Sequence, residues 1–476
     1  MSRLAVIGAV IAAYLVVVAV IGAVAARRTR ANPEDYFLGG RAARTVVLFM
    51  ALFGTNVTPF VLMGIPGIAY HDGVGVFGMN AAIVALGIPL TFWLIGEPAR
   101  RAARNLGAIT PAELYARRLD SKAVGVVMFA LFFAFTVPYM ATAVLGVGLA
   151  VDVLSDGTVP FAAAAAGILL VTLAYTAAGG MRATMWTNVF QGATFLVFVV
   201  VAFFVITGRH GGVAALFEQV AAQAPALLVK GDRPAFAFGR WNSWALAISL
   251  TVIAFPHMLV RIFAARGPQT LKNTCMLYPP ALVLLWAPVV LLGVFGAVLF
   301  PGLEGKHSDR VLPLLVRADL PPVLQGVGLA GLLAAVMSTL DAQLLTLSSM
   351  LGRDVLRVVR PDLAPRAEVR IGRLFTLGLG LVVYAVVVAR PASIFQIAAF
   401  SFSGYVMLVP TLYLGLAWPR FDARAALASM AGGVVVLGAA MVPEAPPLGV
   451  LPVAWGLAAA VALALVVPRF ARAAPR

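Results

Sequence analysis

The sequence predicts an all-α polytopic membrane protein with about 13 transmembrane helices. Of its 476 residues, 62% are hydrophobic and only 11% are charged, whereas a soluble domain carries roughly a quarter charged residues. A hydrocarbon layer about 30 Å thick accepts helices of roughly 20 apolar residues, and runs of about that length recur along the chain. The apolar runs lie at 4–26, 45–71, 74–96, 123–153, 159–178, 186–207, 241–264, 276–300, 320–352, 373–389, 393–417, 424–442 and 447–468.

The first run has a second interpretation, because the small residues at 23–26 resemble a signal-peptide cleavage site. Its length of about 23 residues and the arginines that follow it, at 27, 28 and 30, favour a retained helix. We therefore expect it to span the membrane with the N-terminus outside.

The basic residues fall in short clusters between the apolar runs, so the net charge of +16 does not indicate a nucleic-acid-binding face. With the N-terminus outside, 26 of the 35 Lys and Arg residues lie on one side. The positive-inside rule makes that side cytoplasmic. We expect a multi-pass protein of the plasma (inner) membrane with a cytoplasmic C-terminus, and the sequence implies no obligate protein partner.

Two apolar runs are interrupted by residues that break helices. GTNVTP at 54–59 interrupts the second run, and FPH at 255–257 interrupts the seventh. A proline kink explains either break alone, but backbone in hydrocarbon must be hydrogen-bonded, so a polar break indicates a segment that lines a cavity. Matched breaks about five spans apart predict an inverted repeat with a binding site near the midplane.

The predicted units are an extra helix and cytoplasmic loop (1–44), a first five-helix repeat (45–207), an external loop (208–240), a second five-helix repeat (241–417) and two extra helices (418–476).

The ninth run carries two adjacent hydroxyls, Ser338 and Thr339. With the carbonyl of Ala335 one turn earlier they present three oxygens, and the unwound backbone at Gly54 and Val57 offers more. Na⁺ is a hard cation that prefers oxygen ligands. These residues therefore predict a neutral cage for Na⁺, although hydroxyls also mediate close packing between membrane helices.

Asp341 in the same run is a carboxylate inside the membrane, which is costly and marks a functional group or one half of an ion pair. Arg261, Arg353 and a proton are its possible partners, and the sequence does not choose among them. Arg261 is interpreted as a cytoplasmic anchor whose side chain extends to the membrane surface. His257 can donate to a solute or satisfy the carbonyls of the broken helix.

Four segments resemble the sodium:solute symporter family: DYFLGGR at 35–41, MGIPG at 63–67, GGMRATMWTNVFQ at 179–191 and the region of MST at 337–339. They occur in the family's order over about residues 34–417. The resemblance implies a LeuT-like fold of ten core helices in two inverted repeats, and Na⁺ as the coupling ion. The sodium ligands that it implies are the carbonyls of Gly54, Val57 and Ala335 and the hydroxyls of Ser338 and Thr339.

The chain departs from the family pattern at Asn188, where many sodium-coupled members have an acidic residue. An amide can ligate a cation but does not attract Na⁺ from a distance. We assign Asn188 and Asp341 to coupling or gating, and the stoichiometry and a role for protons stay open.

The segment FPHMLVR at 255–261 resembles the monocarboxylate and acetate branch of the family, and the start of a broken helix suits a carboxylate. The expected function is therefore sodium-coupled symport of a short monocarboxylate by alternating access. Uptake of another small solute, such as an amino acid or a pantothenate-like compound, is the alternative. Residues assigned to the solute by position are Asn56, Thr58, Phe60, Tyr139, His257, Gln396, Ser401 and Tyr405.

Two other classes of protein have weaker support. A membrane-embedded enzyme could use His257 and Asp341 as acid and base, but the sequence has no HExxH, GxSxG or aspartate-rich pair. A transporter-like sensor would need a signalling domain, which the loops are too short to form. We expect neither an enzyme nor a sensor.

Overall fold

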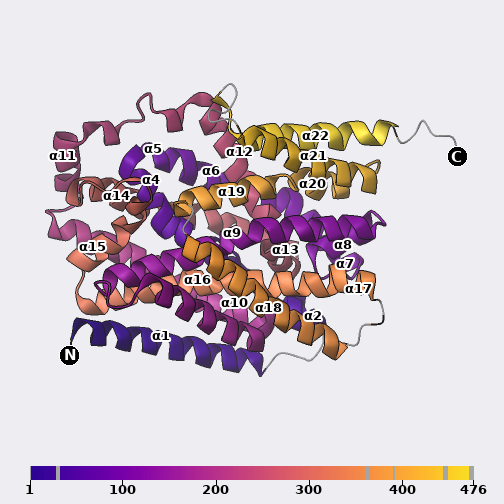
Figure 1. Ribbon diagram of the computed structural model, residues 1–476, viewed down its shortest axis with the longest axis horizontal. Coiled ribbons are helices and arrows are strands. Elements are labelled where there is room, and N and C mark those ends of the chain that lie inside the picture. Colours follow the sequence, from indigo (N-terminus) through magenta and orange to yellow (C-terminus); the bar gives the residue numbers. More distant parts are fainter. Residues whose placement is uncertain are drawn as a thin grey trace.

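The computed structural model describes residues 2–27, 33–360, 362, 365–389, 392–442 and 449–470. Side chains at 26, 33, 36, 174–180, 365–369, 373, 469 and 470 lie outside this description. Tyr36, Gly179 and Gly180 of the family-like segments belong to that group. The part of the chain that is described is a bundle of helices lying roughly along one direction (Figure 1).

Every predicted apolar run is mostly helical over its described residues. The unbroken helical segments are α1 (Arg3–Ala26), α5 (Gly75–Phe77) through η3 (Gly78–Ala82), α6 (Ile83–Thr91) and η4 (Phe92–Gly96) to α7 (Glu97–Asn105), α9 (Lys122–Leu154), α10 (Phe161–Arg209), α14 (Pro268–Leu299), α16 (Pro322–Met350), α18 (Pro365–Ala389), α19 (Ile394–Val406) with α20 (Val409–Ala417), α21 (Ala423–Met441) and α22 (Pro452–Phe470).

The number of membrane crossings remains a prediction. Among the described residues, nine helices are long and apolar enough to cross a membrane, or eleven if two bent pairs each count as one span. The predicted runs 159–178 and 186–207 both lie in α10, and the apolar part of α22 is shorter than the other spans. α1 packs against α10 and α16, whereas α21 and α22 pack against each other at the opposite side of the bundle (Figure 1).

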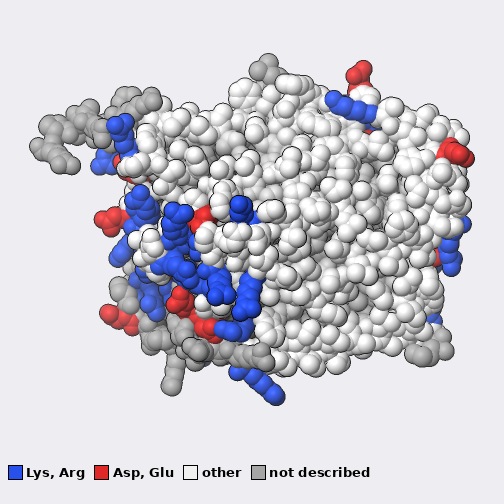
Figure 2. All heavy atoms as spheres, turned by 180° about the vertical axis from the view of Figure 1, so that it is seen from behind, with Lys and Arg blue, Asp and Glu red and all other residues white. Residues whose placement is uncertain are grey.

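The sides of the bundle are apolar and its ends are charged. Figure 2 shows a wide band without charged side chains between a dense basic end and a sparsely charged opposite end. Large apolar side chains on the helix sides are exposed, such as Leu86 (70%), Leu381 (72%) and Val435 (70%). A soluble monomer rarely exposes such a surface, whereas lipid covers it without cost. The described chain begins and ends at opposite ends of the bundle (Figure 1), and its orientation in the membrane remains a prediction.

Both predicted helix breaks are confirmed. α3 (Thr45–Asn56) meets the segment formed by η2 (Phe60–Gly64) and α4 (Ile65–Asp72) at 54°. The backbone at Val57 is extended, with φ −84° and ψ 102°. α12 (Phe238–Ala254) meets α13 (Pro256–Phe263) at 52°, and Phe255 between them is extended as well. Pro256 is the first residue of α13, a position where the missing N–H of proline costs no hydrogen bond.

A short parallel β-bridge joins the two broken helices at the basic end. It pairs Ala43, just before α3, with Ala265, just after α13. The Ala43 N–H donates to the Ala264 carbonyl (3.1 Å), and the Arg266 N–H donates to the Ala43 carbonyl (3.0 Å). The two helices are therefore fastened to each other by backbone as well as by side chains.

The predicted external loop 208–240 has structure of its own. It contains α11 (Val213–Gln223), η5 (Pro225–Leu228) and η6 (Pro234–Phe236). Phe217 of α11 packs edge-on against Phe295 of α14 at 5.3 Å. The Leu227 carbonyl accepts from the Val74 N–H (2.8 Å), and the Arg233 guanidinium donates to the His71 carbonyl (2.9 Å). The segment therefore covers the end of α4.

Candidate sodium and solute sites

The end of α3 and the middle of α16 form a cluster of oxygens. The Ser338 hydroxyl lies 2.9 Å from the Gly54 carbonyl and 3.0 Å from the Ala335 carbonyl. The Thr339 hydroxyl lies 3.0 Å from the Thr55 carbonyl and 2.9 Å from the same Ala335 carbonyl. Three carbonyls thus share two hydroxyl protons, and all five residues are buried. This excess of lone pairs over protons suits a hard cation.

The structure brings together four of the five predicted sodium ligands, Gly54, Ala335, Ser338 and Thr339. Val57 lies directly after the end of α3, in the extended backbone of the break. The Thr55 carbonyl was not predicted. It is available because α3 ends at Asn56, and the last carbonyls of a helix lack partners within that helix.

Gly54 also allows α3 to approach α10. A Cβ atom at this position would lie 3.4 Å from the Asn188 carbonyl, so the two helices are in close contact here. The side chain of Asn188 consequently lies beside the oxygen cluster.

Asn188 binds Arg261, a residue that comes from the second broken helix. A guanidinium only donates, so the amide atom that faces it is the oxygen. In this orientation the Asn188 oxygen accepts from both terminal nitrogens of Arg261, at 2.9 and 2.8 Å, and its nitrogen donates to Gln191 and to the Thr184 carbonyl, both at 2.9 Å. Gln191 in turn donates to the Tyr14 hydroxyl of α1 at 3.3 Å. The network therefore reaches the N-terminal helix.

The interpretation of Arg261 as an anchor at the membrane surface is wrong. Its side chain is completely buried, donates to the Ala51 carbonyl of α3, and lies 3.9 Å from the Asp341 carboxylate, which is also completely buried. Arg353, another partner considered for Asp341, instead lies 3.2 Å from Glu113. Pairing with the buried carboxylate is more favourable for the guanidinium than contact with lipid or extension to the membrane surface. In the pair, each charge neutralises the other.

Aromatic rings fill the break between α12 and α13. We call Phe60, Tyr139, Phe255, Phe402 and Tyr405 the aromatic cluster. The ring of Phe255 stacks on that of Tyr139 at 5.0 Å and meets that of Tyr405 edge-on at 4.9 Å, while Phe402 packs edge-on against Phe60 at 5.1 Å and against Tyr139 at 5.3 Å. All five side chains are buried.

Most of the residues predicted to contact the solute lie at or beside this cluster. The Thr58 hydroxyl accepts from the N–H of Phe60 at 3.2 Å, and the Tyr405 hydroxyl lies 2.5 Å from that of Thr136. His257 stacks on Phe255 at 5.2 Å, and neither imidazole nitrogen has a hydrogen-bond partner within the described residues. Asn56 is half-buried at the end of α3.

Two predicted solute residues make hydrogen bonds within α19 or at its start. The Ser401 hydroxyl donates to the Ile397 carbonyl of its own helix at 3.1 Å. Gln396 is exposed, and its side chain accepts from the Ser393 N–H at 3.1 Å. It occupies the third position of α19 and completes a capping box. This local bond holds the Gln396 side chain at the exposed start of α19, and its assignment to the solute remains a prediction.

Sequence reasoning missed several residues of this region. Phe255 and Phe402 are the rings on which the aromatic cluster is built, and Trp244 extends it by packing on Phe395 and donating to Asn80 at 2.8 Å. Gln343 on α16 is buried with no hydrogen-bond partner for its amide atoms in the described part. Phe255 could have been found from its place in the break, whereas an isolated phenylalanine or tryptophan in an apolar run carries no signal.

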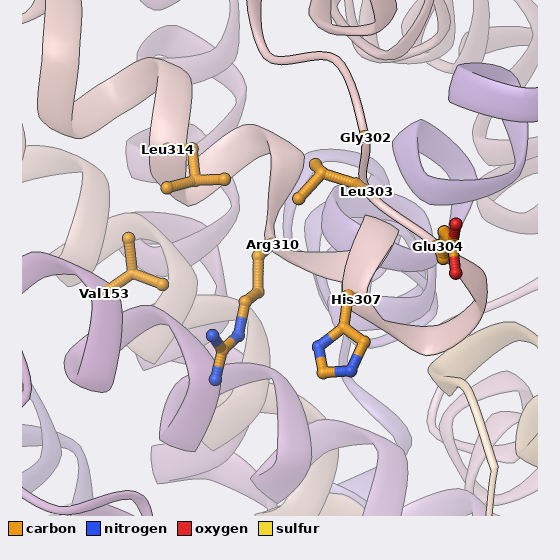
Figure 3. Close-up of a pocket in the computed structure, with 7 residues that line it drawn as sticks. All are labelled: Val153, Gly302, Leu303, Glu304, His307, Arg310 and Leu314. Carbon is orange, nitrogen blue, oxygen red and sulfur yellow. The ribbon is translucent and has the colours of Figure 1, made fainter.

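A cavity of about 460 Å³ lies at the end of the molecule opposite the basic clusters. It is formed around η7 (Gly305–Arg310) and α15 (Val311–Asp319), and Figure 3 shows His307 and Arg310 projecting from η7 in the same direction. Arg310 is paired with Asp152 at 3.1 Å. The charge of Arg310 in this mostly apolar cavity is therefore balanced by a carboxylate.

The buried carboxyl of Asp309 beside this cavity indicates that the stability of the folded protein depends on pH. Its carboxylate accepts from the Ile394 N–H at the start of α19 (2.9 Å), and burial raises the pKa of this carboxyl from 3.8 to about 7. Lys306, His307 and Arg310 are the other ionisable groups that line the adjoining pocket. A carboxyl whose pKa is higher in the folded than in the unfolded protein stabilises the fold fully below about pH 4, and this contribution is lost as the pH rises to 7.

We therefore expect the melting temperature in detergent to fall between pH 5 and pH 7 and the Asp309→Asn variant to show a flatter profile. Thermal melting at a series of pH values measures both. Equal pH profiles for the two proteins would contradict this role of Asp309.

The comparisons with known proteins agree with this geometry. A model of the sodium:solute symporter family matches residues 36–433. The sodium/pantothenate symporter of Escherichia coli (strain K12) is 28% identical over 480 residues, which cover 98% of this chain and 96% of that protein. The sodium/proline symporter of the same organism is 27% identical over 448 residues, covering 89% and 85%.

Solved structures show the same fold. A substrate-bound, outward-open Na⁺-coupled sialic acid symporter superimposes with a TM-score of 0.82 at 18% identity, over 98% of both chains. A nucleobase-cation-symport-1 family transporter in a closed conformation gives a TM-score of 0.63 at 14% identity, over 92% of this chain and 95% of that one. The expected LeuT-like architecture with broken helices is thereby confirmed.

The fold and the relatives define a sodium-coupled secondary active transporter, a multi-pass membrane protein and not an enzyme. The chain belongs to the sodium:solute symporter family. Na⁺ is its coupling ion.

Proposed function

We propose that this transporter carries a small carboxylate-bearing solute of the pantothenate or amino acid type together with Na⁺. The observation that carries the proposal is the place of His257 at the helix break. It is the second residue of α13, 1% exposed, stacked on Phe255, and without a hydrogen-bond partner for either ring nitrogen in the described part of the chain. A buried polar group without a partner is costly, and a bound solute supplies that partner.

The start of α13 favours a negatively charged group. The N-terminus of a helix carries a partial positive charge and N–H groups that point toward a ligand. Pantothenate and proline, which name the two Escherichia coli relatives, each contain one carboxylate. The aromatic cluster offers apolar surface for the rest of such a solute, and the hydroxyls of Thr58 and Tyr139 offer polar contacts.

The relatives support this class of solute better than the short monocarboxylates that the segment 255–261 suggests. That segment includes Arg261, whose guanidinium binds Asn188 and Asp341 and lies beside the oxygen cluster. An arginine engaged in this way gives no information about the solute. Its presence therefore no longer favours acetate or pyruvate over a larger carboxylate.

The break in α3 supplies a physical route for coupling. Gly54 and Thr55 contribute carbonyls to the proposed sodium cage, and the hydroxyl of Thr58, three residues further, accepts from the N–H of Phe60 in the aromatic cluster. A Na⁺ ion held by these carbonyls and by the hydroxyls of α16 fixes the conformation of the break. Solute binding on the other side of the same break is then stronger when the ion is present, and by linkage the solute strengthens Na⁺ binding equally.

Uptake of radiolabelled pantothenate and, separately, of radiolabelled proline by proteoliposomes tests the proposal, with pyruvate, lactate and acetate as competitors. We expect Na⁺-dependent uptake of pantothenate, of proline or of both, which disappears when choline replaces Na⁺. The His257→Ala variant should need a severalfold higher solute concentration for half-maximal uptake, as expected for loss of roughly 1 kcal/mol, with little change in the Na⁺ requirement. Uptake that only acetate or pyruvate inhibits would reject this class of solute and favour a short monocarboxylate.

A further inference from the structure

Arg261 places a permanent positive charge directly beside the proposed sodium cage. Its guanidinium donates to the Ala51 carbonyl, one turn before Gly54 on α3. It also contacts Asn188, whose oxygen lies 3.2 Å from the Thr55 hydroxyl, and Asp341, which is one turn beyond Ser338 on α16. The residues that surround the guanidinium therefore come from the same three helices, α3, α10 and α16, that surround the oxygen cluster.

The groups that hold this guanidinium are those expected of a cation site. They are a backbone carbonyl, an amide oxygen and a carboxylate, all buried, and hard cations such as Na⁺ prefer such oxygen ligands. The Asn188 oxygen accepts from both terminal nitrogens, at 2.9 and 2.8 Å, in the forked geometry that only arginine presents. The position between α10 and α16 is thus occupied by a cation that is covalently part of the protein.

We propose that Arg261 takes the place of a second coupling cation, so that the transporter binds a single Na⁺ ion. The charge of Asp341 is balanced by Arg261, and the cage of carbonyls and hydroxyls is neutral. A second Na⁺ would enter beside a fixed positive charge in a medium of low dielectric constant, where repulsion between like charges is strong. Asn188 fits this arrangement, because an aspartate there would add a second negative charge and leave room for another cation.

The inference depends on the sodium cage and not on the identity of the solute. It is therefore tested by ion binding rather than by uptake. Equilibrium binding of ²²Na⁺ to the purified protein in detergent at pH 8 counts the bound ions directly. We expect wild type to bind about one Na⁺ per chain, because one neutral oxygen cage remains for the ion.

Removing the guanidinium should create a second site. The Arg261→Gln variant leaves the Asp341 carboxylate and the Asn188 oxygen beside the cage, and we expect it to bind about two Na⁺ per chain, since the carboxylate then attracts a cation. The double variant Arg261→Gln, Asp341→Asn lacks both charges and should return to about one. Arg261→Lys keeps the positive charge and serves as the matched control, again with about one ion.

Two results overturn the proposal. One is a wild-type protein that binds two Na⁺, a measurement that does not depend on whether any variant folds. The other is a folded Arg261→Gln protein that binds no more Na⁺ than wild type. A solute panel that fails in transport assays leaves these ion counts unaffected, so failure of the proposed function and failure of this inference are distinguishable.

Discussion

Replacing Ser338 and Thr339 together by alanine is expected to raise the Na⁺ concentration for half-maximal uptake on the order of a hundredfold or more. Each hydroxyl is one of the proposed oxygen ligands, and a polar contact to a charged group contributes about 1.5–3 kcal/mol. Every 1.4 kcal/mol changes a binding constant about tenfold. Uptake measured against NaCl concentration at constant ionic strength gives the shift.

Ser349→Ala is the matched control for this variant. Ser349 is on the same helix, is buried, and donates to the Thr346 carbonyl at 2.8 Å, so it resembles Ser338 in its bond to the preceding turn. We expect its Na⁺ requirement to equal that of wild type. If the double variant also keeps the wild-type requirement, Na⁺ does not bind at these hydroxyls.

The Asp341→Asn variant is expected to lose about 3–5 kcal/mol of stability, because removal of one partner leaves the buried charge of Arg261 unbalanced. Removing both charges in Arg261→Gln, Asp341→Asn should restore most of this loss, since no buried charge then remains without its counterpart. Thermal melting in detergent compares the three proteins. A double variant less stable than the single one would show that charge balance is not the reason.

Asp156→Asn provides the comparison with an exposed carboxylate. Asp156 is paired with Arg3 and Arg317 at the end of the bundle, where its side chain is 43% exposed. Ion pairs in water contribute about 0–1 kcal/mol, so we expect little change in melting. The contrast between Asp156 and Asp341 isolates the effect of burial.

The helix breaks and most of the cage were predictable because their signals are local. Glycine, proline and polar residues inside an apolar run have few explanations in a membrane, and both breaks occur where they were predicted, at Val57 and Phe255. Ser338 and Thr339 lie three and four residues beyond Ala335, so helix geometry brings both hydroxyls within reach of the same carbonyl. The bonds that they make to Gly54 and Thr55 confirm that the two helices meet at this point.

The partners of Asp341 and the position of Gln396 were not predictable. Arg261 and Asp341 are 80 residues apart, and an arginine near the predicted end of a span is as compatible with an exposed anchor as with a buried pair; only the packing of α13 against α3 and α16 distinguishes them. Gln396 looked like a cavity residue because it begins an apolar run, but its capping bond to Ser393 determines its direction. The helix α11 in the segment 208–240 was missed for a similar reason, since its burial depends on α14.

The backbone bridge between Ala43 and Ala265 has a mechanical consequence. Because it joins the start of α3 to the end of α13, we expect these two half-helices to move as one body about the basic end of the bundle. The extended residues Val57 and Phe255 lie at the other end of these two half-helices. We therefore expect a displacement at either residue to move both half-helices, and with them the proposed sodium and solute sites.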